Sequence, residues 1–370
     1  MLRKIVIIAY KLLKPWRLGG YLVRVCVIGG SGYTGGEMLR YLATHREAEV
    51  TYITSREYAG KPIHFAHPNL RGFYKGARFE AINIDRILKM CDASFFATPL
   101  EVSLEYIPKV VETGIKIVDL SPAFRLKDLD AFKRYYELEH PAPDLLEKAV
   151  YGLPEIHIYR ERLRNSQLIA SPGCNATASI LSIYPLAYSR KISYPVTIDI
   201  KAGSSEAGSK PTPWDHHPER AGSVRPYSPR GHRHVAEVIR VLRDLGEESP
   251  KVSIVPHAVP IVRGVLSSTH LYMEISEEEL ARIFVERYMG SPFIRILYGA
   301  PNPYPDPKNV VGTNLADLGF AAEKEAGRVS IFVAIDNLGK GAAGQALQAF
   351  NIAMGFDERE GLWIPPPRPA

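Results

Sequence analysis

Short apolar runs alternate with helical segments through the first half of the chain. Runs at Val23–Ile28, 50–54, 93–97 and 115–119 predict strands. A glycine cluster follows the first run, and a helix is expected from about residue 36 to residue 44. Strands that alternate with helices are typical of βαβ units, so this half predicts a parallel sheet.

The pattern changes near residue 171. A helix is expected from 175 to about 189, and the strands that follow are longer, alternate in polarity and are rich in β-branched residues. They suit a mixed or antiparallel sheet of an α+β domain. The irregular stretch 203–231 is dense in Gly, Pro, Ser, His and Arg, and so long a loop is usually functional. The predicted strands are Val196–Ala202, 252–260, 265–275 and 329–336, and a last helix at about 342–354 precedes a Pro-rich tail.

Composition narrows the class of protein. A chain of 370 residues favours two domains, and a hydrophobic content of 46% is enough for a packed core. The formal net charge is +6, with the basic residues spread along the chain. This balance suits a protein that meets phosphates or an acidic partner, and it gives only weak support for nucleic-acid binding.

Three features that the sequence lacks predict where in the cell the protein is located. No apolar run approaches the roughly 20 residues that a membrane span needs. The apolar stretch at 5–9 is too short for the core of a signal peptide, so residues 1–21 are expected to be an extension outside the fold. Cys26, Cys91 and Cys174 show no CxxC spacing, which argues for a reducing compartment and against a disulfide framework. We therefore expect a cytoplasmic protein.

Residues 30–35 fit the pattern G-x-G-x-x-G, directly after an apolar strand and at the opening of a helix. Glycines permit the tight turn and let the backbone approach a pyrophosphate, which rests on the helix N-terminus. A glycine-rich turn without a ligand is the alternative. The βαβ setting near the start of the fold favours a dinucleotide site.

The end of the second strand indicates which dinucleotide is bound. An NAD enzyme usually carries an acidic residue there, for the ribose 2′-hydroxyl. Here the strand ends at Thr54, Ser55 and Arg56, and a guanidinium beside a hydroxyl suits a 2′-phosphate. Glu57 argues for NAD, and Arg56 could be a solvated surface residue. The pattern favours NADP.

Cys174 follows a Pro-Gly turn and falls in the first turn of a predicted helix. The helix dipole and the free N–H groups there favour a thiolate and lower the thiol pKa. The same N–H groups could hold the oxyanion of a tetrahedral intermediate. The alternative, a buried structural cysteine, is preferred for Cys26 and Cys91.

A cysteine nucleophile needs an acid or base nearby. His232, His234 and Glu237 open a predicted helix after the irregular loop, and His234 and Glu237 share a face. The imidazole can move protons while the carboxylate orients it. The two histidines at 216–217 are the competing candidates for this acid or base. Four histidines so close also suggest a metal, but no cysteine or carboxylate pattern supports zinc, so no metal is expected.

These residues resemble a known family, the N-acetyl-γ-glutamyl-phosphate reductases and their lysine-pathway relatives. The resemblance covers nearly the whole chain after about residue 22. It rests on six motifs in order: Gly-Gly-Ser-Gly-Tyr-Thr-Gly at 29–35, Asp-Leu-Ser-Pro-Ala-Phe-Arg at 119–125, Tyr-Gly-Leu-Pro-Glu at 151–155, Ser-Pro-Gly-Cys-Asn-Ala-Thr at 171–177, His-Arg-His at 232–234 and Asp-Asn-Leu-Gly-Lys-Gly-Ala-Ala-Gly-Gln at 336–345.

The resemblance implies an α/β architecture. A Rossmann NADP-binding domain at 22–172 would precede a catalytic and oligomerisation domain at 173–337, an α+β domain like the C-terminal one of glyceraldehyde-3-phosphate dehydrogenase. The helix at 338–357 would return to complete the Rossmann domain, and 358–370 would be a Pro-rich tail. A homodimer or homotetramer is the family expectation.

The resemblance also implies roles for single residues. It makes Cys174 the nucleophile and puts His232, His234 and Glu237 at the reaction centre. Candidates for the substrate phosphate are Arg125, Ser204, Ser205 and Lys210. The residues that it implies for NADP are Ser31, Gly32, Tyr33, Thr34, Ser55, Arg56, Glu57 and Asn337.

The motif His-His-Pro-Glu-Arg at 216–220 is similar to the lysine-pathway branch. Members of that branch act on glutamate or 2-aminoadipate held on a small acidic carrier protein. Four arginines in or beside this stretch would form a positive surface that steers the carrier, or they would only bind phosphate or solvent. They are Arg220, Arg225, Arg230 and Arg233.

The implied chemistry reduces an acyl phosphate to a semialdehyde through a thioester on Cys174, with NADPH as the hydride donor and His234 or His232 as the acid. The product would serve lysine or arginine biosynthesis. Three alternatives stay open: reduction of free N-acetyl-γ-glutamyl phosphate, reduction of aspartyl phosphate, and a non-catalytic protein that binds NADP or nucleic acid.

Overall fold

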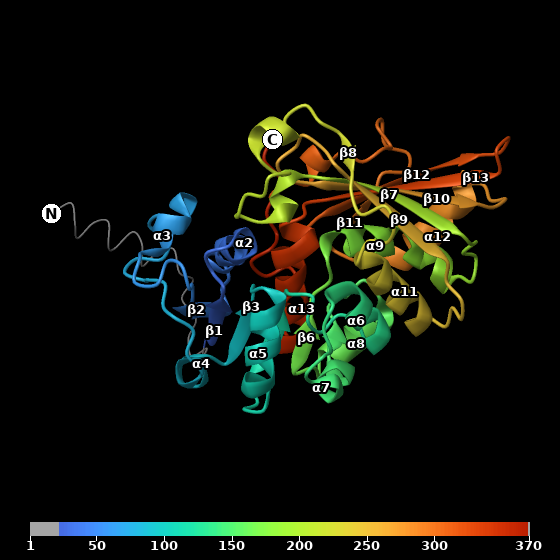
Figure 1. Ribbon diagram of the computed structural model, residues 1–370. Helices are drawn as coiled ribbons and strands as arrows, with labels where there is room; N and C mark the ends of the chain where they lie inside the picture. Colours follow the sequence, from blue (N-terminus) through green and yellow to red (C-terminus); the bar gives the residue numbers. More distant parts are fainter. Residues whose placement is uncertain (1–21, 369–370) are drawn as a thin grey trace.

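Two β-sheets at different ends of the molecule organise the chain (Figure 1). The structure is a computed structural model, and it describes residues 22–368. The extension predicted at 1–21 lies outside the described residues. Within 22–368, no helix combines the length and the apolar character that crossing a bilayer requires.

The first sheet is fully parallel, as predicted, with strand order β2-β1-β3-β4-β6-β5. The chain leaves β1 toward β2 on one side and continues with β3 on the other. Ligands of such sheets bind at the carboxyl ends of the strands where the order reverses. The strands are β1 (Val23–Ile28), β2 (Ala48–Ile53), β3 (Ala93–Phe96), β4 (Lys116–Asp119), β5 (Val150–Tyr151) and β6 (Leu168–Ala170).

Helices cover this sheet, and the first begins earlier than predicted. Helix α2 starts at Tyr33 rather than near residue 36, because Gly35 and Gly36 belong to its first turn. A Cβ on Gly35 would stand 2.4 Å from the carbonyl oxygen of Gly29, so this glycine serves close packing of helix and turn. The helices are α2 (Tyr33–Leu42), α3 (Ile63–Ala66), η1 (Pro68–Leu70), α4 (Ile84–Met90), α5 (Leu100–Val111), α6 (Leu129–Tyr136), α7 (Pro143–Lys148) and α8 (His157–Leu163).

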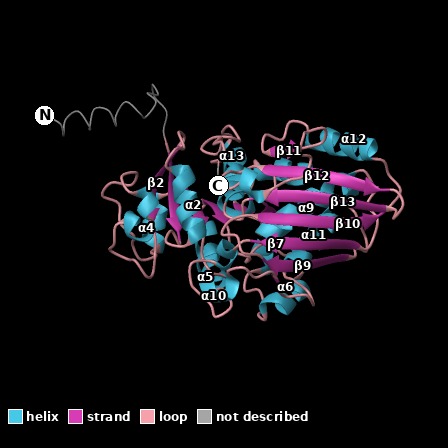
Figure 2. Ribbon diagram, turned by 90° about the horizontal axis from the view of Figure 1, so that it is seen from above, coloured by secondary structure: helices cyan, strands magenta, loops and turns pink. Residues whose placement is uncertain are grey.

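The second sheet is mixed, in the order β11-β12-β13-β10-β7-β9-β8, and its long strands lie side by side in Figure 2. Only the pairs β7–β9 and β11–β12 are parallel. The sequence pattern did not predict β11 and β12. The strands are β7 (Val196–Ala202), β8 (Arg225–Pro226), β9 (Val252–Ala258), β10 (Val265–Tyr272), β11 (Ile294–Ile296), β12 (Ala316–Glu323) and β13 (Arg328–Ile335).

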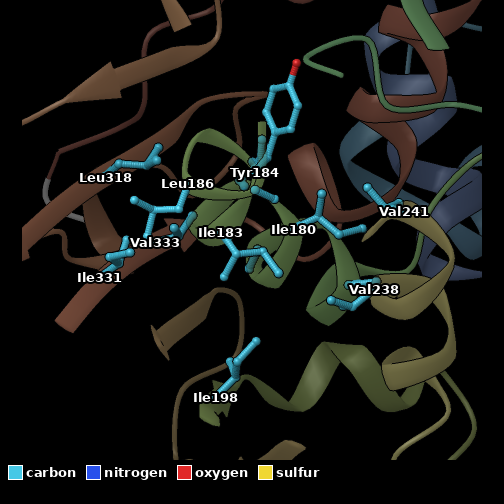
Figure 3. Close-up of a cluster of buried hydrophobic side chains, with 14 of the residues drawn as sticks. Ile180, Ile183, Tyr184, Leu186, Ile198, Val238, Val241, Leu318, Ile331 and Val333 are labelled. Carbon is cyan, nitrogen blue, oxygen red and sulfur yellow. The ribbon is translucent and has the colours of Figure 1, made fainter. Parts of the chain in front are cut away.

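Helix α9 (Cys174–Tyr188) lies in the core beside this sheet, and nearly all of its side chains are buried. Figure 3 shows Ile180 and Ile183 of α9 gathered with Val238 of α11 (His234–Asp244) and Val333 of β13. Burying side chains of this size stabilises the fold by about 1.5–3 kcal/mol each. The position of Cys174 is therefore fixed by a helix that cannot shift without opening the core. The other helical segments are η2 (Ser204–Ala207), α10 (His217–Arg220), α12 (Glu277–Tyr288) and η3 (Pro307–Asn309).

The end of the chain returns to the first sheet. A π-helical turn, η4 (Gly339–Ala343), leads into α13 (Gly344–Met354), and the rings of Phe350 and Phe95 have centroids 5.1 Å apart. In η4, the fully buried Lys340 donates to Oε1 of Glu155 at 2.6 Å. Apolar packing and a buried ion pair thus tie the last helix to the first half of the chain.

The expectation that the cysteines form no disulfide is wrong for two of them. Cys26 in β1 and Cys91 at the end of α4 are joined by a disulfide, with their Cα atoms 5.7 Å apart. This separation lies within the range that disulfides require. The two residues are 65 positions apart, so spacing in the sequence could not reveal that the sheet brings them together. Cys174 is free and half-buried.

Candidate active site

The loop between β1 and α2 is shaped to receive a phosphate group. Gly29 has φ +82°, which favours glycine, and a Cβ there would stand 2.4 Å from the carbonyl oxygen of Ala97. Gly32 precedes α2, and no side chain caps the helix. A Cβ on Gly32 would meet nothing closer than 3.9 Å. The free N–H groups and the open space before α2 fit a dinucleotide pyrophosphate.

The structure brings the two predicted parts of the cofactor site together. The hydroxyl of Ser31 hydrogen-bonds the hydroxyl of Ser55 over 2.8 Å, linking the glycine loop to the end of β2. Arg56 and Glu57 follow Ser55 in the chain, and both residues are exposed. Tyr33 is exposed at the start of α2. A hydroxyl pair beside an exposed guanidinium suits an additional phosphate on the ribose.

Cys174 is the first residue of α9, directly after Gly173. Its Sγ lies 3.7 Å from Oδ1 of Asn175 and also receives a hydrogen bond from the backbone N–H of that residue. Gly341 of η4 passes so close that a Cβ there would stand 2.6 Å from Cβ of Cys174. The predicted place of the cysteine at a helix start is confirmed.

The Asn175 N–H at the helix start lowers the thiol pKa, as predicted, but the predicted net lowering is wrong. Burial raises the pKa of the Cys174 thiol well above its ordinary value, and the Glu206 carboxylate raises it further. The backbone N–H of Asn175, Arg125 and Arg233 act in the opposite direction and do not outweigh burial. These surroundings therefore favour the neutral thiol over the thiolate.

His232 and His234 meet at the start of α11, with ring centroids 4.6 Å apart. The backbone N–H of His234 donates to Nδ1 of His232 at 3.3 Å. Burial, reinforced by Arg233, lowers the pKa of His232 to about 4. Burial lowers the pKa of His234 well below its ordinary value, and His232, Arg233 and Arg125 lower it further. Both imidazoles are neutral at pH 7, and Nδ1 of His234 has no hydrogen-bond partner among the described residues.

Glu237 joins the cysteine loop, residues 171–174, to α11. Its Oε2 accepts from the Tyr151 hydroxyl at 2.7 Å and from the Gly173 N–H at 3.1 Å, and its Oε1 accepts from Arg125 at 3.3 Å. Nε2 of His234 lies 3.8 Å from the carboxylate, too far for a hydrogen bond. Glu237 shares a face with His234, as predicted, but its hydrogen bonds hold the residue before Cys174.

Arg125 is buried beneath the same loop. Its Nε donates to the carbonyl of Ser171 at 2.7 Å, and its Nη2 donates to the carbonyl of Leu120 at 2.8 Å. With the bond to Glu237, each guanidinium nitrogen has a partner in the protein. These contacts favour support of the loop over direct contact with a substrate phosphate.

The other candidates for the substrate phosphate, and Asn337 of the predicted cofactor site, lie in other segments of the chain. Asn337 donates to the Ser205 hydroxyl at 2.8 Å and accepts from the Gly264 N–H at 2.8 Å. The Ser205 hydroxyl donates to the carbonyl of Val262 at 2.7 Å. Ser204 is half-buried and Lys210 is exposed. Asn337 and Ser205 thus connect the end of β13 to η2, and their polar groups are already in use.

A cavity of about 710 Å³ is lined by Glu206, whose carboxylate accepts from Asn175, the residue after Cys174. Its lining includes Glu206, Tyr227 and His232, together with three of the four predicted arginines. Arg230 and the competing pair His216 and His217 are exposed, and none of the three lines this cavity. The arginines of the cavity wall are Arg220, Arg225 and Arg233.

Sequence reasoning missed Glu206. The residue lies within the irregular stretch, where no periodic pattern marks a buried position. In the structure its Oε1 accepts from Asn175 Nδ2 at 2.8 Å and from the Tyr227 hydroxyl at 3.3 Å. Its Oε2 is buried and has no partner among the described residues. The only signal in the sequence was an acidic residue next to the candidate Ser205.

Comparisons with known proteins match both halves of the chain to semialdehyde dehydrogenases. The model of the semialdehyde dehydrogenase NAD binding domain matches residues 24–166, and that of the semialdehyde dehydrogenase dimerisation domain matches residues 174–337. Among solved structures, aspartate semialdehyde dehydrogenase II from Vibrio cholerae superposes with a TM-score of 0.68 at 16% identity, covering 91% of this chain and 99% of that one. At this identity the similarity concerns the fold.

Two curated relatives are much more similar in sequence. The LysW-L-2-aminoadipate/LysW-L-glutamate phosphate reductase of Sulfolobus acidocaldarius is 54% identical over 353 residues, which cover 94% of this chain and all of that protein. The protein of the same name from Sulfurisphaera tokodaii is 56% identical over 352 residues, with the same coverage. The similarity extends through both sheets and the cysteine loop.

Proposed function

Because the chain belongs to the semialdehyde dehydrogenase family, we propose that it reduces a γ-glutamyl or aminoadipyl phosphate, held on a carrier protein, to the semialdehyde. Phosphate is released, and the product serves lysine or arginine biosynthesis. The printed names of relatives more than half identical over nearly the whole chain support this substrate class. The fold and the cysteine loop support an acyl-phosphate reductase of the phosphorylating type.

The placement of Cys174 carries the proposal. The sulfur stands at the uncapped start of a buried helix, and its neighbour Asn175 donates to Glu206, which lines a cavity of about 710 Å³. Attack of the sulfur on the acyl carbon gives a thioester, and the N–H groups of the first turn of α9 would hold the oxyanion. Covalent capture divides one difficult step into two easier ones.

His234 is the proposed acid for the carbonyl oxygen of the substrate. Its neutral ring keeps one nitrogen free, and the His232 ring beside it holds it in place. A neutral imidazole can donate only from a protonated nitrogen, so the tautomer must carry the proton on the side that faces the substrate. Glu237 and Arg125 would position the cysteine loop.

NADP is the proposed cofactor, and when bound its reduced nicotinamide supplies the hydride. Ser31, Gly32, Tyr33 and Thr34 would contact the pyrophosphate and ribose. Arg56 with Ser55 and Glu57 would contact the 2′-phosphate region. Asn337, whose amide links β13 to η2, would act from the nicotinamide side. The match to an NAD binding domain supports the dinucleotide, and the Ser55–Arg56 sequence supports the 2′-phosphate.

The proposed partner is a small acidic carrier protein. Arg225 and Arg233 line the cavity, and Arg230 is exposed between them in the chain. Arg220 is paired with Asp215 at 3.2 Å, so part of its charge is already compensated. Such an arginine surface would attract an acidic partner and orient it over the cavity. The names of the relatives include LysW, which supports a carrier.

The domain division and assembly belong to the same proposal. We place the boundary between 172 and 173, with 338–357 completing the first domain and 358–370 as a tail. The match to a dimerisation domain over 174–337 supports a homodimer or homotetramer. A cytoplasmic location follows from the proposed dependence on NADPH and on a biosynthetic carrier.

The test runs the reaction in reverse. The purified enzyme receives phosphate, NADP and one of three aldehydes: the carrier-bound semialdehyde, free N-acetylglutamate semialdehyde or aspartate semialdehyde. The carrier-bound aldehyde should be oxidised with the highest kcat/KM. Cys174→Ala should abolish turnover and leave NADPH binding intact. A preference for either free aldehyde would overturn the carrier assignment, and salt-sensitive nucleic-acid binding without reductase activity would overturn the whole proposal.

A further inference from the structure

An ion-pair cluster joins the helix α2 to the end of β13. Arg263, in the loop between β9 and β10, donates through Nη2 to Oε1 of Glu37 at 2.7 Å and to Oδ2 of Asp336 at 2.5 Å. Its Nε donates to Asp336 at 3.2 Å, and its Nη1 donates to Glu37 at 3.4 Å. One guanidinium thus bridges a helix that covers the first sheet and the end of a strand of the second.

The charges of this cluster are balanced. The buried carboxylates of Glu37 and Asp336 face two guanidinium groups, because Arg40 also donates to Glu37, at 2.8 Å and 3.1 Å. Burial raises the pKa of Glu37, but Arg40 and Arg263 outweigh burial and hold that pKa below its ordinary value. Paired bonds between a guanidinium and a carboxylate fix geometry as well as charge, so the cluster gives α2 one defined position relative to β13.

Both ends of the cluster belong to the proposed cofactor site. Glu37 lies one turn into α2, the helix that follows the glycine loop. Asp336 directly precedes Asn337, the residue proposed for the nicotinamide side. The residue after the arginine, Gly264, donates its N–H to Oδ1 of Asn337 at 2.8 Å. The loop between β9 and β10 therefore holds the helix at one end of the cofactor site and the asparagine at the other.

The same loop reaches toward the cysteine through η2. The carbonyl of Val262 accepts from the N–H of Ser205 at 3.0 Å and from its hydroxyl at 2.7 Å. Ser205 lies next to Glu206, which accepts from Asn175 beside Cys174. The guanidinium takes no part in these bonds, so its replacement should leave the surroundings of the sulfur intact.

We propose that Arg263 positions the cofactor for hydride transfer, because its two ion pairs keep α2, and the dinucleotide bound there, aligned with Asn337 and Cys174. The inference rests on the proposed function for the cofactor and the reaction. Arg263 acts through Glu37 and Asp336, so it is a positioning residue and not a catalytic one. A guanidinium stays protonated in proteins, and it exchanges no proton in this role.

The first variant, Arg263→Gln, leaves partners for both carboxylates. Glu37 keeps its two bonds from Arg40, and Asp336 keeps the N–H of Gly312 at 2.5 Å. The variant should therefore fold. What it loses is the link between the two parts of the cofactor site.

The first measurement compares the binding of two ligands by calorimetry. NADPH has both an adenosine half and a nicotinamide half, whereas 2′,5′-ADP has only the adenosine half with its phosphates. Arg263→Gln should raise the Kd of NADPH about tenfold, the effect of losing one hydrogen bond on the nicotinamide side, and should leave the Kd of 2′,5′-ADP unchanged. An equal rise of both Kd values, or no rise of either, would overturn the proposal.

Glu37→Gln removes the partner of the arginine on α2 and should give the same difference between the two ligands. The double variant with Arg263→Gln should bind NADPH no more weakly than either single variant, because both changes break one link. Additive losses would contradict a shared role. Arg160→Gln is the matched control, since it breaks a half-buried ion pair with Glu358, at 3.0 Å, outside the cluster. It should change neither Kd.

The second measurement is acylation of Cys174 by p-nitrophenyl acetate without cofactor, followed by the burst of nitrophenolate. Arg263→Gln should acylate as fast as the wild type, although it should form NADPH from the carrier-bound semialdehyde and phosphate about tenfold more slowly. Arg263→Lys retains the charge and should recover part of that rate. Acylation slowed as much as NADPH formation would mean that the cluster supports the whole site, and would overturn the proposal.

The two proposals can fail separately. A wild type that acylates and binds NADPH but does not oxidise the carrier-bound semialdehyde would overturn the proposed function. The difference between NADPH and 2′,5′-ADP in Arg263→Gln would then still support the alignment of the cofactor by Arg263. A wild type that binds NADPH no more tightly than 2′,5′-ADP would overturn the inference itself, because the nicotinamide side would then contribute nothing to binding.

Discussion

The backbone N–H of Gly173 donates a 3.1 Å hydrogen bond to Oε2 of Glu237, so that α11 holds the residue before Cys174, the proposed nucleophile. Glu237→Gln should lower kcat by about a hundredfold, because a small displacement of the loop misplaces the sulfur. It should also destabilise the protein by about 3 kcal/mol, because Arg125 loses its buried counter-charge. Steady-state kinetics and denaturant unfolding measure the two effects.

The matched control is Glu161→Gln, at an exposed position of α8. Neither its activity nor its unfolding midpoint should change. A Glu237→Gln enzyme with wild-type kcat and reduced stability would show that the hydrogen bond to Gly173 supports the fold alone and not the reacting geometry.

The local features of the site could be predicted where a short motif determines the backbone. Gly30 and Gly32 mark the phosphate loop, and Gly173 marks the helix start that presents Cys174; both places were found in the sequence. Strands such as Val196–Ala202 were predicted with their observed bounds, because alternating burial leaves a clear pattern.

What the sequence could not show depends on contacts between distant segments. The disulfide of Cys26 and Cys91 arises because β1 and the end of α4 meet, and the raised pKa of the Cys174 thiol depends on Glu206 from another element. Helix dipole arguments consider only the helix of the cysteine itself, and burial outweighs them here. Glu206 was missed for the same reason, since it lies in a stretch without periodicity.

Arg56 should determine the preference for NADPH. The side chain is exposed beyond the Ser31–Ser55 hydrogen bond, where a ribose 2′-phosphate would lie. Arg56→Ala should raise KM for NADPH at least tenfold, about the effect of losing one charge-assisted hydrogen bond, and should leave KM for NADH unchanged. Initial rates with both cofactors measure this. Arg282→Ala, at an exposed position of α12, is the control, and an equal rise of both KM values would assign Arg56 to the common part of the dinucleotide.

The disulfide between Cys26 and Cys91 should leave one titratable thiol. Denatured, unreduced protein should react with one equivalent of Ellman's reagent, from Cys174, and reduced protein with three. Cys91→Ser should lower the free energy of unfolding by about 2–4 kcal/mol, since the link constrains the unfolded chain. Activity at moderate temperature should persist, because both cysteines lie away from the cavity wall. Three thiols in the unreduced protein would contradict the link.

The stability of the protein should depend on pH through His232. Its pKa is lowered to about 4 in the folded protein, against about 6.5 in an unfolded chain. Between these values the unfolded chain binds more protons, so the free energy of unfolding falls as the pH is lowered from 6.5 to 4. Over this range His232 should lower the free energy of unfolding by about 3 kcal/mol. Above pH 6.5 it should lower it by nothing, because the ring is neutral in both states. The site opposes protonation because the ring is buried beside Arg233.

The difference between wild type and His232→Gln isolates this contribution. Burial raises the pKa of Asp119 to about 6, so that residue changes stability in the opposite direction over an overlapping range, and a single curve cannot separate the two. In His232→Gln, unfolding by denaturant at several pH values should give a flatter acid branch than in the wild type. His64→Gln, at an exposed position of α3, should reproduce the wild-type curve. Parallel curves for wild type and His232→Gln would mean that the His232 ring is solvated, and the neutral histidine pair proposed for proton transfer would lose its structural basis.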